Sequence, residues 1–186
     1  GEPVVDGDRA AVDWWAAAPM LVLVVGALVL MLVSCFVPPR RGTVGYTIFT
    51  CAVAIGAAVA TVPLWIEVQD AERGPFSTMA GAVGVDGFSV FLTVVIAAAV
   101  VLAALLADGY LRREDMEGPE FYVLMLLSAS GGVIMAMAND LIVLFLGLET
   151  LSISVYVLAA MHLGRVQSQE SGIKYFVLGA FSSAFF

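Results

Sequence analysis

The sequence predicts an all-α membrane protein, a polytopic bundle of transmembrane helices, and two observations carry that prediction. The first is composition. Of the 186 residues, 61% are hydrophobic and 13% are charged, and the mean hydropathy is +1.00. A soluble domain of this size has too little interior to bury so much apolar side chain. The second is that the apolar residues form repeated runs of about twenty, the length that crosses a bilayer as a helix. The runs do not alternate with polar residues, which is untypical of a β-barrel.

The charge balance and the missing motifs narrow the classes of function. The net charge of −8 argues against a nucleic-acid partner, which requires clustered Lys and Arg. There is no Gly-rich phosphate loop, CxxC, paired-His or GxSxG motif. We therefore expect no nucleotide, flavin, iron–sulfur or metal site in this chain. Cys35 and Cys51 fall inside apolar runs, which predicts buried packing in the membrane and no disulfide.

The N-terminal end is predicted to be an exposed tail followed by a first spanning segment. Residues 1–14 are acidic and polar and lack the basic start of a secretory signal. The first segment is expected at about residues 15–37, with Trp14 and Trp15 as an aromatic anchor at the membrane interface. The run Pro-Pro-Arg-Arg-Gly at 38–42 ends this segment.

Two further segments are expected at about residues 43–66 and 88–107. Pro63 lies near the end of the earlier one, where a membrane helix tolerates a kink. Between them, residues 67–86 form a polar, acidic stretch that we expect to be a loop, with Gly74 and Pro75 as its turn.

The fourth to sixth segments follow after the polar stretch that carries Arg112 and Arg113. The fourth spans about residues 120–138 and contains small residues that permit close helix packing, namely Ser128, Ser130, Gly131 and Gly132. Asn139 and Asp140 make a tight turn and cap into the fifth segment, which runs to about Met161. The sixth begins near Glu170, and its apolar run still continues at Phe186. We therefore expect part of a longer membrane protein.

The Lys and Arg residues of the short loops predict the orientation in the membrane. The loops after the first, third and fifth segments carry five arginines, whereas the opposite side carries two: Arg40, Arg41, Arg112, Arg113 and Arg165 against Arg9 and Arg73. Because positive loops stay in the cytoplasm, the N-terminus is predicted to lie outside.

Two ionisable residues are the candidates for function. Glu149 lies near the middle of the fifth segment, where a charge costs about 2.5–3.5 kcal/mol or more. Packing in lipid does not need an acid there, so an intramembrane carboxylate indicates function. Lys174, the only lysine of the chain, lies near the start of the sixth segment. Alternatively, Lys174 is an interfacial lysine whose side chain extends toward water.

Depth along the helices suggests how these two residues are related. At 1.5 Å per residue, Glu149 lies roughly 12 Å into its segment and Lys174 about 6 Å above the expected start of the sixth. The axial offset is then roughly 10–15 Å, which favours a hydrated relay over a direct ion pair.

Three further residues form the predicted supporting polar face of the fifth segment. Ser152 and Tyr156 follow Glu149 by three and seven residues and share its helix face, where they can orient the carboxylate or a water chain. Alternatively, they bond backbone carbonyls or a neighbouring helix. His162, at the cytoplasmic end, either passes protons at neutral pH or is an ordinary interfacial histidine. Ser154 lies off this face and is expected to pack.

The motifs resemble a known family. The stretches VDGFSVFLT, EFYVLMLLSASGGVIMAMANDL, LFLGLETLSISVYVLAA and QESGIKYFVLGAFSSAFF are similar to subunit N, an antiporter-like membrane subunit of the proton-pumping NADH-quinone oxidoreductase, respiratory complex I. The motifs are clear over about the last hundred residues, and the first two segments match in pattern.

The resemblance implies a longer protein of about fourteen helices with two inverted five-helix repeats. Residues 15–107 would be three accessory helices, and 120–186 would begin the first repeat. Glu149 and Lys174 match the family's glutamate and lysine of the fifth and sixth segments, while the central channel lysines belong to later segments. Thr150 follows Glu149 where relatives usually carry an apolar residue, and it either bonds the acid or serves packing.

The sequence thus predicts a proton-translocating, non-redox subunit in the plasma membrane of a bacterium. Its partners would be lipid and the other membrane subunits of complex I, and NADH, flavin, iron–sulfur clusters and quinone would be bound by partner subunits. The alternatives are a subunit of a related cation/proton antiporter and a purely structural membrane scaffold.

Overall fold

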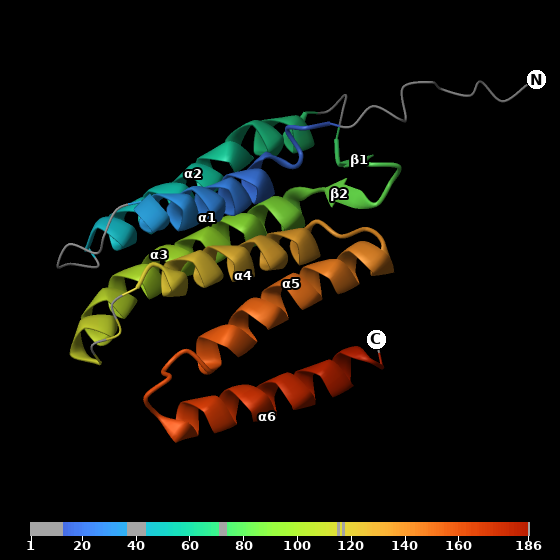
Figure 1. Cartoon of the computed structure of the whole chain (residues 1–186). Coiled ribbons are helices and arrows are strands. Elements are labelled where there is room, and N and C mark those ends of the chain that lie inside the picture. Colours follow the sequence, from blue (N-terminus) through green and yellow to red (C-terminus); the bar gives the residue numbers. More distant parts are fainter. Residues whose placement is uncertain (1–12, 37–43, 71–73, 115, 117, 186) are drawn as a thin grey trace, which may run out of the picture.

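The structure is a computed structural model that describes residues 13–36, 44–70, 74–114, 116 and 118–185. These residues form six helices and one small hairpin, so the predicted all-α membrane class is confirmed (Figure 1). In chain order the elements are α1 (Ala18–Phe36), α2 (Val44–Gln69), β1 (Phe76–Thr78), β2 (Val83–Val85), α3 (Gly87–Arg113), α4 (Glu120–Ala136), α5 (Leu141–Ala159) and α6 (Val166–Ser183).

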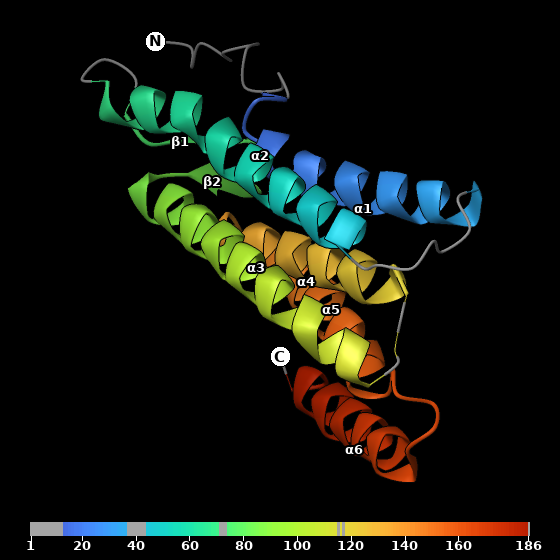
Figure 2. The ribbon, with the colours of Figure 1, turned by 90° about the vertical axis from the view of Figure 1, so that its left-hand side faces the viewer.

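The helices pack as a four-helix group to which two more are added. Within the group, α1 contacts α2 and α4, and α3 contacts α2 and α4. α5 then packs on α4, and α6 packs on α5, so that α6 lies at the outer edge of the molecule (Figures 1 and 2). Four of the described helices, α1, α2, α3 and α5, are long and apolar enough to span a bilayer. α4 is apolar but has 17 residues, and α6 begins with a polar half.

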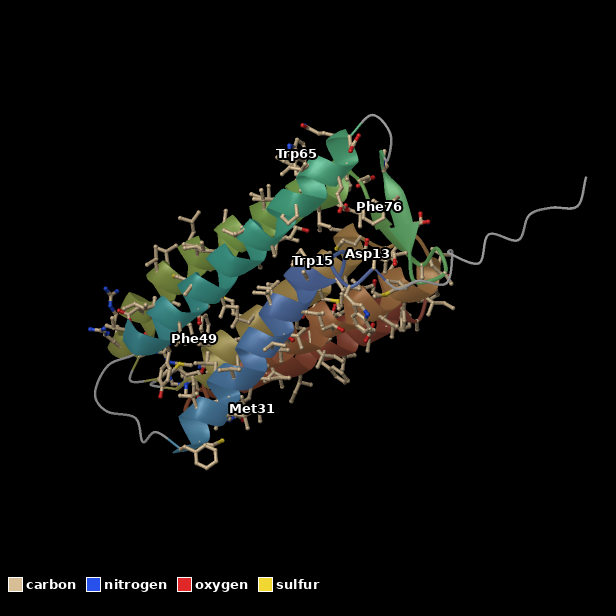
Figure 3. The ribbon with its side chains drawn as sticks, turned by 90° about the horizontal axis from the view of Figure 1, so that it is seen from above. Asp13, Trp15, Met31, Phe49, Trp65 and Phe76 are labelled. Atoms are coloured by element: carbon tan, nitrogen blue, oxygen red, sulfur yellow. The ribbon has the colours of Figure 1, made fainter. Side chains whose placement is uncertain are left out.

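The two ends of the bundle differ in chemistry. One end, which we call the hairpin end, carries β1, β2, the α4–α5 turn and the aromatic residues Trp15, Trp65 and Phe76 (Figure 3). The other end, the arginine end, carries the described residues Arg112, Arg113 and Arg165. The residues 1–12, 38–42 and Arg73, on which part of the predicted topology rests, lie outside the described residues.

The stretch 67–86, predicted as a loop, is partly regular structure. α2 continues to Gln69, and β1 pairs antiparallel with β2, with Phe76 opposite Val85 and Thr78 opposite Val83. The turn between the strands holds Met79 and Ala80 at positive φ, a conformation that sequence patterns associate with Gly or Asn. Three-residue strands joined by such a turn give little sequence signal, which explains why the loop prediction was wrong here.

The hairpin ties the start of α5 to the rest of the bundle. Asn139 donates through its backbone N–H to Ala82 O at 3.0 Å and through Nδ2 to Gly81 O at 2.9 Å, while Gly84 N–H donates to Met137 O at 2.8 Å. Asp140 then caps α5 by accepting from Ile142 N–H at 2.6 Å. The predicted turn and cap at Asn139 and Asp140 are therefore confirmed.

Two helix boundaries differ from those expected. α3 continues to Arg113 and does not end at residue 107, and Asp108 and Arg112 pair within its last turns at 3.0 Å. α6 begins at Val166, four residues before the expected start at Glu170, because the mainly polar residues 166–169 are also helical. Cys35 lies on an exposed face of the membrane-length helix α1, Cys51 is half-buried, and both thiols are free, so their burial in the membrane stays a prediction.

Candidate functional site

The candidate site begins at the crossing of α4 and α5, which fixes the position of α5. A Cβ on Gly131 would lie 2.5 Å from Leu151 N and 2.7 Å from Gly147 O, and one on Gly147 would lie 2.9 Å from Met135 N. Such distances are too short for any side chain and mean that the two backbones touch. The expectation that small residues of the fourth segment permit close packing is confirmed at Gly131.

Glu149 lies two residues beyond this crossing, on another side of α5. At 100° per residue, it is rotated about 200° from Gly147 and therefore points away from α4. The residue is half-buried, and its Oε1 is buried without a hydrogen-bond partner among the described residues. Thr150 donates its hydroxyl to Leu146 O at 2.8 Å, so this threonine bonds its own helix and not the acid.

The residues that share the Glu149 face have separate environments. Tyr156 is buried at 9% exposure and packs edge-on against Tyr175 and Phe176 of α6, with ring centroids 5.0 and 5.7 Å away. Ser152 is half-buried. Neither hydroxyl bonds Glu149 in the described structure. Ser154 is buried and donates to Thr150 O at 2.9 Å, in agreement with its predicted packing role.

Lys174 is not brought into contact with Glu149. α6 faces α5 through Gly172, where a Cβ would lie 2.5 Å from Ala160 Cβ, and through Gly179, which abuts the Tyr156 ring. Lys174 is about 200° around the helix from Gly172, and its side chain is 69% exposed. There it forms an ion pair with Glu170, one turn earlier.

The axial positions of the acid and the lysine follow from the α5–α6 contacts. Gly172 is level with Ala160, so Lys174 lies about 3 Å and Glu149 about 16 Å further from the arginine end. The offset of about 13 Å agrees with the expected 10–15 Å, although Lys174 is now near the middle of α6, about 12 Å from its start.

His162 lies in a charged cluster at the arginine end. Arg165 Nη2 donates to Glu114 Oε2, and His162 Nε2 lies 3.7 Å from the same oxygen. Glu114 follows α3, so this cluster joins the α3–α4 connection to the α5–α6 connection. The other ring nitrogen, Nδ1 of His162, is buried without a hydrogen-bond partner among the described residues.

Two acids of these pairs were missed by sequence reasoning. Glu170 precedes Lys174 by four residues, a spacing that signals an ion pair once both are known to be helical. Glu114 is separated from Arg165 by 51 residues, and nothing in the sequence pairs them. Across the described residues, no group of three or more His, Cys, Asp or Glu gathers as metal ligands do.

Comparison with known proteins first defines the class. Residues 138–186, which include α5 and α6, match the family described as NADH:quinone oxidoreductase/Mrp antiporter, transmembrane. Similarity to curated proteins extends over most of the chain and is more specific. The chain is 38% identical to NADH-quinone oxidoreductase subunit N of Trichlorobacter lovleyi over 90% of its length. It is 38% identical to subunit N 2 of Roseiflexus castenholzii over 94%, and 41% identical to subunit N of Methylobacterium nodulans over 90%.

These relatives confirm the recognition made from the motifs and extend it to the first two helices, which had matched in pattern alone. The chain spans about a third of the length of the curated relatives it matches, 33% in each of these three.

Proposed function

We propose that this protein is a proton-translocating, non-redox membrane subunit of a proton-pumping NADH-quinone oxidoreductase. The observation that carries the proposal is Glu149, a half-buried carboxylate with an unpartnered oxygen in a helix long enough to span the membrane. A group of this kind is costly in a membrane and is retained where ions or protons are handled. The relatives are named as subunits of NADH-quinone oxidoreductase, and we propose that electron transfer from NADH to quinone is the reaction coupled to proton movement.

The arrangement favours a relay with several steps. Glu149 is on the side of α5 that carries Tyr156 toward α6, and the pair of Glu170 and Lys174 is on the outer side of α6. Because the axial offset is about 13 Å, water has to connect the two groups. A change in the hydration or charge around Glu149 alters which protonation state is favoured and so moves the proton. His162 beside Glu114 would exchange protons at the arginine end.

In this proposal the arginine end faces the cytoplasm of a bacterium and the hairpin end faces outward, following the distribution of arginine. Residues 15–107 act as accessory helices and 120–186 begin the first antiporter-like repeat. The family model matches residues 138–186, which lie within the second of these ranges. A cysteine at Ser77, in β1, should react with a membrane-impermeant maleimide added from outside. Reaction from the cytoplasmic side alone would reverse the orientation.

NADH, flavin, iron–sulfur clusters and quinone belong, in this proposal, to partner subunits. The second candidate, a cation/proton antiporter subunit, is favoured by the family description, which includes Mrp antiporters. Affinity purification of the tagged full-length protein from mild detergent separates the two. Co-purification of flavin and iron–sulfur subunits with NADH–quinone activity is expected. Recovery of a complex that lacks them and exchanges cations for protons would establish the antiporter instead.

A further inference from the structure

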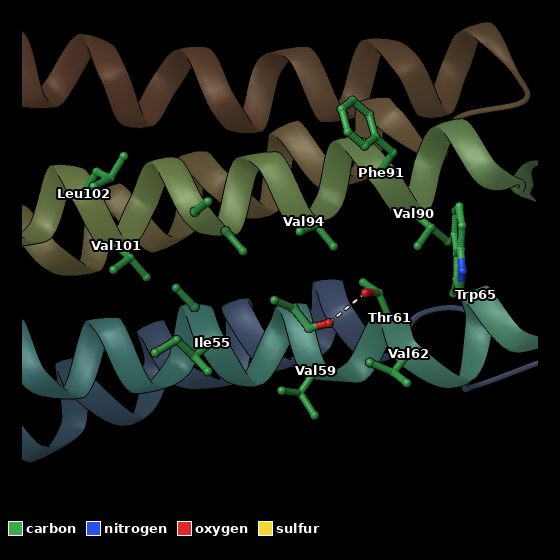
Figure 4. Close-up of a pocket in the computed structure, with 14 residues that line it drawn as sticks. Ile55, Val59, Thr61, Val62, Trp65, Val90, Phe91, Val94, Val101 and Leu102 are labelled. Atoms are coloured by element: carbon green, nitrogen blue, oxygen red, sulfur yellow. Dashed lines mark hydrogen bonds between the residues drawn. The ribbon is translucent and has the colours of Figure 1, made fainter.

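An apolar groove of about 780 Å³ lies between α2 and α3 (Figure 4). We call it the α2–α3 groove. Val90, Val94 and Val101 point from α3 toward α2, and the Trp65 ring stands across one end (Figure 4). The groove plays no part in the relay, since Glu149, Lys174 and His162 lie on α5, on α6 and in their connection.

The lining of the groove offers no polar group to a ligand. All its side chains are apolar except those of Thr61 and the weakly polar Trp65 indole. The Thr61 hydroxyl donates to Ala58 O at 2.7 Å and is thereby occupied. Small residues, Ala54, Ala58, Ala97 and Ala98, form part of the lining and leave the space open. An occupant must therefore be a flexible apolar group that requires no hydrogen bond.

The length of the groove distinguishes an acyl chain from a partner helix. From Ala54 to Trp65 on α2 it covers about 16 Å, and from Val90 to Leu102 on α3 about 18 Å. These lengths match one leaflet, half of a hydrocarbon core of about 30 Å. α3 continues eleven residues past Leu102 to Arg113 without the groove. A transmembrane partner helix would cross both leaflets and would need a complementary face along both.

The position of Trp65 places the headgroup. Trp65 lies at the hairpin end, four residues before the last residue of α2, where tryptophan at the membrane interface is typical. We propose that the α2–α3 groove binds one acyl chain of a phospholipid of the leaflet at the hairpin end, with the headgroup beside Trp65. The bound chain fills a furrow that would otherwise be a void in the lipid-facing surface.

The test uses the full-length protein in its assembled complex, reconstituted with a phosphatidylethanolamine that carries a photoreactive diazirine midway along one acyl chain. Peptide mapping after irradiation is expected to place the label on groove residues of α2 and α3 several-fold more than on the exposed apolar face of α1, around Leu28 and Leu32. Equal labelling of the two surfaces in the unsubstituted protein overturns the proposal, whatever the variants do.

Groove-filling variants sharpen the test. Ala98→Phe and Ala58→Phe, one from each helix, are expected to reduce groove labelling at least about fivefold, while Ala52→Phe, an exposed α2 position outside the groove, leaves it unchanged. Labelling that persists in both filled variants contradicts a bound chain. Cross-linking of a cysteine at Val94 to a neighbouring subunit would assign the groove to a protein partner. Displacement of the label by a long-chain isoprenoid quinone would assign it to a quinone tail.

Discussion

The first four helices and the last two are built differently. The buried apolar core of the described residues belongs to α1–α4 and the hairpin, and its last member along the chain is Met137. The buried positions of α5 are Gly147, Ser154 and Tyr156, and the described part of α6 has Gly172. The candidate relay residues all follow Met137. Apolar packing thus stabilises the first region, while the candidate relay residues lie in the second.

This difference matters for a relay. A well-packed apolar core resists rearrangement. A relay that works by changes in hydration and pairing has to lie outside such a core. Residues that fix α5 on the core are therefore expected to affect folding, and residues on α5 and α6 away from that contact are expected to affect proton movement with little effect on folding.

The largest effect on folding is expected at the crossing that joins the two regions. In Gly147→Ala, the new Cβ meets Met135 N at 2.9 Å and Gly131 O at 3.0 Å, and backbone atoms cannot move aside as a side chain can. We expect a loss of about 1–3 kcal/mol in stability, measured as a lower thermal transition in detergent and a lower yield of assembled complex. The matched control is Gly109→Ala in α3, where no atom lies within 4 Å. Equal stability of the two variants would contradict the close crossing.

A smaller effect, on function alone, is expected at Lys174. Lys174→Ala should assemble normally and lower proton pumping several-fold, because the relay loses its positive charge near the middle of α6. Lys174→Arg should retain part of the rate. The control is Arg112→Ala, an exposed cation at the arginine end. Proton uptake by reconstituted vesicles measures the effect, and parental pumping by both Lys174 variants would leave Lys174 as an interfacial lysine without a role.

The smallest effect is expected at the arginine end, where the α3–α4 connection contacts the α5–α6 connection. Glu114→Gln removes the charge that Arg165 pairs with, in a partly exposed place where an ion pair contributes about 0.2–1 kcal/mol. A double-mutant cycle with Arg165→Gln, read by thermal unfolding, should give a coupling energy in that range. Additive single effects would mean that the pair contributes nothing to joining the two regions.

Features that depend on residues close together in the sequence could be predicted, whereas contacts between distant residues could not. The six helical segments were predictable because hydropathy over twenty residues is a local signal, and the Asp140 cap is an adjacent-residue effect. The end of α3 and the start of α6 were missed because mainly polar residues, 108–113 in α3 and 166–169 in α6, continue the helices beyond their apolar runs.

Contacts between distant residues were beyond sequence reasoning. The bond from Asn139 to Gly81 and the Glu114–Arg165 pair join residues 58 and 51 positions apart. The side of α6 on which Lys174 lies depends on where Gly172 and Gly179 meet α5. The position of Glu149 within a membrane-length helix was predictable, because a carboxylate in a continuous apolar run is conspicuous without any knowledge of its neighbours.

The most direct test of proton translocation through this chain is Glu149→Gln in the full-length protein, in an assembled complex, with proton translocation followed in inverted vesicles. Glutamine keeps the size and part of the hydrogen bonding but cannot release a proton. We expect normal assembly and pumping lowered at least about tenfold, with Glu149→Asp retaining part of the rate and the exposed Glu120→Gln unchanged. Parental pumping by a fully assembled Glu149→Gln variant would contradict the account and leave Glu149 a structural residue.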